Sequence, residues 1–146
     1  MALGKGNTYA NDILALVLNA TPIANIADDA SSSPLTDLWI SLHTASPEAG
    51  TQTTSECSYT GYARQSVARS NSSPEWTVSS GAAYNTNEIM FDECTVGSST
   101  ATHFAVGTGE FGSGKVLYCG ELTDPLAIGV GVTPKFSAGD LDITED

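Results

Sequence analysis

The sequence predicts an all-β protein of about eight strands, built as a sandwich, a jelly roll or a barrel. Its composition favours this class, because only 15% of the 146 residues are charged, against about 25% in an average globular protein. Ser, Thr, Gly and Val are abundant, which suits strands and turns. From Leu35 onward, short segments with a period of two alternate with clusters of turn-forming residues.

The clearest strand runs from Leu38 to His43, where aliphatic and other residues alternate. Further strands are expected at Tyr62–Arg69, Trp76–Ser79, Glu88–Phe91, His103–Gly107, Lys115–Leu122, Ala127–Val132 and Leu141–Thr144. The residues expected in the core are Leu38, Ile40, Leu42, Phe104, Val106, Leu141 and Ile143. Trp39 falls on the opposite face of its strand, where it would meet a second layer or an interface.

A short amphipathic helix is predicted from Asn7 to Leu18, with Asn7 or Thr8 as its cap. Its apolar stripe consists of Ile13, Leu14, Val17 and Leu18. From Asn19 to Pro34 no period is visible, which indicates an extended connection. The chain is therefore expected to divide into an N-terminal arm, residues 1–34, and a β domain, residues 35–146.

The charge of the chain excludes several partners. Five Lys and Arg face 17 Asp and Glu, so the formal net charge is −12. Such a chain lacks the basic surface that binds nucleic acid, and an anionic membrane would repel it. No apolar run reaches the ~20 residues of a membrane-spanning helix, and no secretory signal is visible at the N-terminus. We expect a protein made in the cytoplasm, without nucleic-acid or membrane partners.

The motifs that suggest chemistry have simpler explanations. Gly107 to Val116 resembles a phosphate-binding loop, but Val116 stands where a magnesium-binding Ser or Thr and a helix would follow. A flexible hairpin turn fits better. His43 and His103 lack the spacing of a metal site or a catalytic group, so they are expected as polar residues on the second face of a sheet.

No catalytic residue, metal site or cofactor is therefore expected. The 3 cysteines show no C-x-x-C spacing and are expected as buried thiols. The acidic tail from Gly139 to Asp146 is expected to form a solvated strand at a sheet edge. Arg64 and Arg69 supply two of the five Lys and Arg residues, so acidic partners are expected for both.

Five segments in order resemble a small tailed-phage virion protein family. They are Leu38–Pro47, Gly61–Gln65, Ala101–Val106, Leu117–Pro125 and Phe136–Thr144. Members of this family are often labelled tail fibre proteins, and some resemble the jelly-roll cement proteins that brace capsids. The resemblance implies an antiparallel β-sandwich of jelly-roll type with a structural role and no chemistry.

The leading hypothesis is a non-enzymatic capsid cement, or decoration, protein on the outer surface of the phage head. Its partners would be the major capsid protein and one or two further copies of itself, as a dimer or trimer. The residues expected to bind partners are Ile13, Leu14, Val17, Leu18, Trp39, Arg64 and Arg69. The alternatives are a tail fibre or tail-tip component and a carbohydrate-binding module, in which Trp39, Trp76, Tyr59 and Tyr62 would form a platform for sugars.

Overall fold

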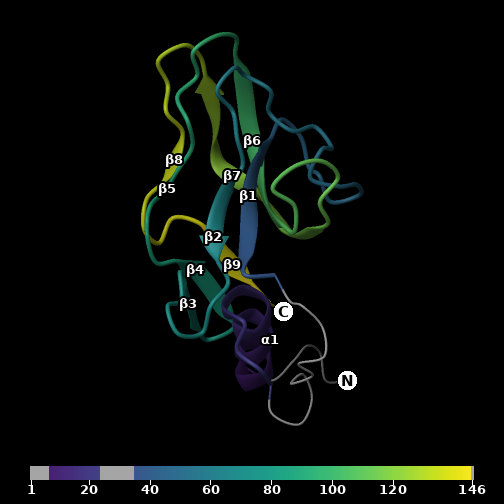
Figure 1. The fold of residues 1–146 in the computed structure, drawn as a ribbon, viewed down its shortest axis with the longest axis vertical. Coiled ribbons are helices and arrows are strands. Elements are labelled where there is room, and N and C mark those ends of the chain that lie inside the picture. Colours follow the sequence, from purple (N-terminus) through teal and green to yellow (C-terminus); the bar gives the residue numbers. More distant parts are fainter. Residues whose placement is uncertain (1–6, 24–34, 146) are drawn as a thin grey trace. The chain divides into compact units, whose positions relative to one another are not determined.

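The computed structural model describes residues 7–23 and 35–145 and confirms the all-β class (Figure 1). Helix α1 (Asn7–Asn19) lies near the N-terminus, where the helix was predicted. The strands are β1 (Asp37–His43), β2 (Gln65–Ala68), β3 (Trp76–Ser79), β4 (Ala82–Asn85), β5 (Ile89–Met90), β6 (Ser99–Gly107), β7 (Val116–Ile128), β8 (Lys135–Phe136) and β9 (Asp142–Thr144). No helix in these two ranges is long and apolar enough to span a membrane.

The contacts divide the chain into two compact units, and each is described by itself. The first unit draws its described residues from Met1–Asp37, Ala68–Glu88 and Phe136–Asp146. The second consists of Leu38–Val67 and Ile89–Lys135. Helix α1 thus shares a unit with β3, β4 and β9. The division into an arm and a β domain at residues 34 and 35 stays a prediction.

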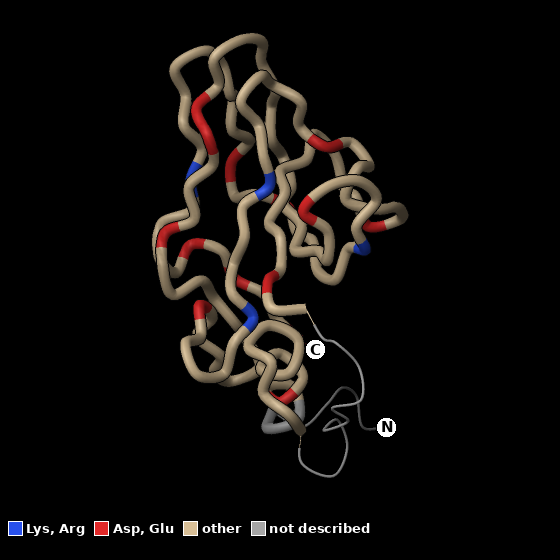
Figure 2. The backbone as a smooth tube through the Cα atoms, viewed as in Figure 1, with Lys and Arg blue, Asp and Glu red and all other residues tan. Residues whose placement is uncertain are grey.

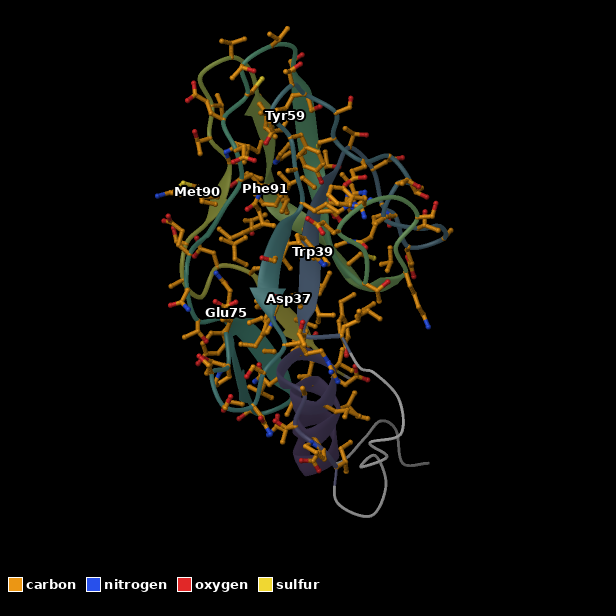
Figure 3. All side chains as sticks on the ribbon, viewed as in Figure 1. Asp37, Trp39, Tyr59, Glu75, Met90 and Phe91 are labelled. Atoms are coloured by element: carbon orange, nitrogen blue, oxygen red, sulfur yellow. The ribbon has the colours of Figure 1, made fainter. Side chains whose placement is uncertain are left out.

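The second unit is built on the sheet with strand order β2-β1-β6-β7. β1 pairs antiparallel with β6, which places Ile40 opposite Val106 and Leu42 opposite Phe104. These four side chains are buried, as the alternation in the sequence predicted. Beyond β5, Phe91 is buried whereas its neighbour Met90 is 52% exposed, and Figure 3 shows the two side chains pointing apart.

In the first unit, helix α1 packs on β3 and β4 of the three-stranded antiparallel sheet β3-β4-β9. Leu14 and Leu18 have no exposed surface, and Trp76 of β3 is also buried. Leu141 and Ile143 complete the expected core, since both are buried. β9 lies at the edge of its sheet, so the predicted position of the acidic tail is confirmed for Asp142–Thr144.

Arg69 makes a different contact from the one expected. Its guanidinium donates hydrogen bonds to the carbonyl oxygens of Leu16 (2.6 Å), Val17 (2.5 Å) and Leu35 (3.1 Å). Leu16 and Val17 lie in the last turn of α1, where carbonyl groups have no partner within the helix and the dipole favours a cation. Within the described residues of this chain, backbone carbonyls therefore take the place of the acidic partner predicted for Arg69, and an acidic partner on a neighbouring copy stays a prediction.

Two parts of the strand prediction also need correction. β7 continues from Val116 to Ile128, where two strands separated by a break were expected. β4 and the two-residue strand β8 were not predicted. Ala82–Asn85 follows a turn directly and contains only one large apolar side chain. That turn has Ser80 and Gly81 at positive φ, 53° and 77°, which lets β3 reverse into β4.

Candidate interaction site

The glycine-rich segment joins the antiparallel strands β6 and β7, so the predicted hairpin turn is confirmed. We call residues 108–115 the glycine loop. Thr108 and Lys115 close its base, because the Thr108 amide donates to the Lys115 carbonyl at 3.1 Å and the Lys115 amide donates to Thr108 Oγ1 at 3.0 Å. The loop leads from strand to strand, with no helix to form a phosphate site.

Gln52 holds the base of the glycine loop from inside the second unit. Its side chain is fully buried, and its Oε1 accepts a hydrogen bond from the Gly109 amide at 2.9 Å. The backbone N–H of Gln52 donates to the Gly114 carbonyl at 2.9 Å. A Cβ at Gly107 or Gly114 would lie 2.0 or 2.1 Å from the Gln52 side chain. These glycines therefore leave the space that a buried glutamine needs.

Arg64 holds the far side of the glycine loop. Its Nη1 donates to the Gly109 carbonyl and its Nη2 to the Gly112 carbonyl, both at 2.8 Å. The same guanidinium forms a two-point ion pair with Glu56, with Nε–Oε1 at 2.7 Å and Nη2–Oε2 at 2.8 Å. The acidic partner predicted for Arg64 is thus confirmed. The hydrogen bond with Glu56 raises the pKa of Arg64 above its ordinary value, so the charge is retained.

Tyr62 connects this ion pair to the sheet. Its hydroxyl donates to Glu56 Oε1 at 2.8 Å and accepts a hydrogen bond from the Leu42 amide at 3.1 Å. Burial raises the pKa of Tyr62 well above its ordinary value, so the hydroxyl keeps its proton. We call Gln52, Glu56, Tyr62 and Arg64 the loop clamp.

The glycine loop, held by the loop clamp, carries an exposed aromatic side chain. Phe111, between Glu110 and Gly112, is 79% exposed, the highest fraction among the large apolar residues described. Gly112 has φ of 68°, a conformation that glycine adopts without strain. Hydrogen bonds at Gly109 and Gly112, on either side of Phe111, fix the backbone that carries it. The phenyl ring therefore projects from an ordered loop.

A groove of about 500 Å³ begins where the glycine loop ends. Its wall consists of Val116, Leu117, Tyr118, Cys119, Gly120 and Glu121 of β7, together with Ser46, Glu48 and His103. β7 is at the edge of its sheet, beside β6. Desolvation raises the pKa of the Cys119 thiol, which makes the thiol a poor nucleophile at neutral pH.

Ser41 and His43 form a contact that resembles a nucleophile beside a base. His43 Nδ1 lies 2.8 Å from the Thr54 carbonyl, which only accepts, so Nδ1 carries the proton. Ser41 Oγ then donates to Nε2 at 2.8 Å. Both residues have no exposed surface, so no substrate reaches them in this structure. His43 does lie on the second face of its strand, but that face is buried at Ser41 and His43.

The remaining expected site residues lie as follows. Leu14 and Leu18 are buried against the first unit's own strands, so they present no apolar surface to a partner. Ile13, Val17, Trp39 and Arg69 are half-buried. Cys57 and Cys94 are buried as expected, whereas Cys119 is half-buried. Within the described ranges, no group of three or more His, Cys, Asp and Glu is arranged to hold a metal.

The sugar platform of the carbohydrate-binding alternative would lack two of its four rings. Trp76 and Tyr59 are 1% and 4% exposed, so neither offers a ring face to a sugar. Tyr62 is instead stacked on Phe91, with ring centroids 6.2 Å apart, and meets Tyr59 edge to face at 5.5 Å. This aromatic cluster belongs to the interior of the second unit.

Sequence reasoning missed Gln52, Glu56 and Phe111. The glycines from Gly107 to Gly114 were a visible signal, because such a run marks a close backbone approach as well as a turn. Nothing in the sequence shows that Gln52 provides the group they approach.

A comparison with protein-family models matches residues 6–144 to the family described as "Podophage GP4 fiber I protein gp80". No curated protein matches the chain.

Proposed function

Because the chain belongs to the podophage GP4 fiber I protein gp80 family, it is a structural protein of a bacteriophage particle, and we propose that it is a non-enzymatic fibre component. The family match covers nearly the whole chain, including both units and the glycine loop. The description of this family as a fibre protein supports the fibre over the head as the location.

The loop clamp is the observation that carries a structural role for this site. Gln52, Glu56 and Arg64 form hydrogen bonds with backbone atoms, with each other and with the hydroxyls of Ser41 and Tyr62. Burying an ion pair costs several kcal/mol of desolvation free energy per ion, which the attraction between the two ions offsets. Here that interaction orders a surface loop and its exposed Phe111. Fixing an aromatic residue in advance lowers the entropy lost on binding another protein.

A capsid cement protein is the second candidate. The described chain forms two compact units, with no long repetitive segment of the kind that makes a fibre shaft. A protein of this form also suits binding to the major capsid protein on the outside of a head. Both candidates place the protein in the virion, and they differ in its location on the particle.

Separating the particle tests the location. Purified phage would be disrupted, heads and tails separated by density, and the chain quantified by mass spectrometry in each fraction. Gold-labelled antibody against the chain, applied to intact particles, provides a second readout. A fibre component goes with the tail fraction and labels projecting fibres. Recovery with the heads, with label spread over the shell, would contradict the fibre proposal and support the cement candidate.

A further inference from the structure

The glycine loop and the groove along β7 have complementary properties within one chain. The loop presents an ordered phenyl ring, and the groove offers Val116, Leu117 and Tyr118 in its wall. The groove has a volume of about 500 Å³. Pockets that hold small ligands have volumes of ~300–1,000 Å³, and such ligands are larger than a phenyl ring, so the groove has room for the ring of Phe111. We propose that the glycine loop of one copy docks in the β7 groove of a second copy, with Phe111 as the anchor. This inference rests on the structural role proposed above.

Charge favours this occupant. The chain has few cations, and Figure 2 shows Asp and Glu distributed over it with Lys and Arg at few positions. Lys115 is one of those cations and is exposed at the base of the glycine loop. The groove carries the exposed carboxylates of Glu48 and Glu121. The loop also carries the exposed carboxylate of Glu110 beside Phe111. A docked orientation that places Lys115 at the acidic rim and Glu110 away from it is therefore favoured, which sets the orientation of the partner.

The position of the two features suits a symmetric pair. The glycine loop ends at Lys115 and the groove wall begins at Val116, so both belong to one continuous stretch of surface. A two-fold interface requires such a stretch, because each copy must supply both the inserted residue and the pocket. β7 is also an edge strand, so a second copy can approach it without displacing β6.

The loop clamp gives Phe111 the properties of a binding hot spot. Aromatic residues that fill a pocket at the centre of an interface dominate its affinity. A flexible glycine loop would lose much of that gain when it became ordered on binding. Hydrogen bonds from Arg64 to Gly109 and Gly112 remove this cost before the partner arrives.

The oligomeric state is the first test. Sedimentation equilibrium would compare the full chain with Phe111→Ser and with Val130→Ser, a matched control that removes another exposed apolar side chain, 70% exposed, from a different loop. We expect a self-associating wild-type chain, an unchanged Val130→Ser variant and at least about a tenfold weaker association for Phe111→Ser. A monomeric wild-type chain, or an oligomer unaffected by Phe111→Ser, would overturn the proposal.

Cross-linking then tests the pocket, because Cys119 lines the groove. A tagged chain with Phe111→Cys and Cys119→Ser would be mixed with the untagged wild-type chain under mild oxidant. We expect a mixed disulfide dimer, with positions 111 and 119 joined in its mass-spectrometric peptide map. The control chain carries Val130→Cys and Cys119→Ser. No cross-link to Cys119, or one equally strong from the control, would overturn the groove as the docking site.

The two proposals fail separately. If the chain is found on fibres but is monomeric and does not cross-link, self-docking is refuted and the fibre role stands. If Phe111 drives association and the chain is recovered with heads, self-docking stands and the fibre role is refuted.

Discussion

Both carboxylate oxygens of Glu56 accept hydrogen bonds from the Arg64 guanidinium, and the same guanidinium donates hydrogen bonds to two carbonyl groups of the glycine loop. One buried cation thus connects a carboxylate on one segment to the backbone of another. This relationship attaches the exposed glycine loop to a buried side chain of the second unit, and its consequences can be measured.

Replacing Arg64 by Met should destabilise the protein strongly. The change leaves the Glu56 carboxylate without its partner, and breaking one side of a buried pair costs about 3–5 kcal/mol. Equilibrium unfolding in urea measures the loss. The double variant Arg64→Met, Glu56→Leu should lose less than the sum of the two single variants, because no charge is left unpaired. Strictly additive losses would show that the pair is not coupled.

Gly107→Ala should destabilise the protein through a clash with the buried amide of Gln52. The three heavy atoms nearest to the new Cβ would all belong to the Gln52 side chain, at 2.0 to 2.5 Å. We expect a loss of about 1–3 kcal/mol, typical of overpacking. Adding Gln52→Ala should make the glycine substitution nearly neutral relative to Gln52→Ala alone. Gly129→Ala is the matched control, since nothing lies within 4 Å of its Cβ.

Arg69→Met should loosen helix α1. The variant removes the donors to the Leu16 and Val17 carbonyls, and it leaves those carbonyls without this partner. The expected cost is about 1–3 kcal/mol, with faster hydrogen exchange of the α1 amides. The amides of β6 serve as the internal reference. Unchanged exchange in α1 would show that Arg69 does not hold the helix.

Stability should fall as the pH drops below the ordinary His pKa of 6.5, because burial lowers the pKa of His43 in the folded state. Between the two values the unfolded chain binds the proton that folded His43 rejects, so the free energy of unfolding rises with pH. His43→Asn removes this contribution from the variant. Parallel pH profiles of unfolding for the two proteins would refute the assignment.

The sequence predicted those parts of the fold in which alternation is regular. Leu38, Ile40 and Leu42 revealed β1 because a two-residue period has one structural meaning. The residues Ala82–Asn85 did not reveal β4, because this strand depends on pairing with its neighbours β3 and β9 more than on its own side chains. The loop clamp was missed for the same reason. Gln52, Arg64 and the glycine loop are far apart in sequence, and tertiary contacts alone bring them together.

The central claim is that this chain is a fibre component of the virion. A cryo-electron-microscopy reconstruction of the intact particle tests it most directly. If the chain is a fibre component, density for the two compact units appears in a fibre that projects from the particle, in adjoining copies. The same density arranged over the faces of the head shell, with none in any fibre, would contradict it.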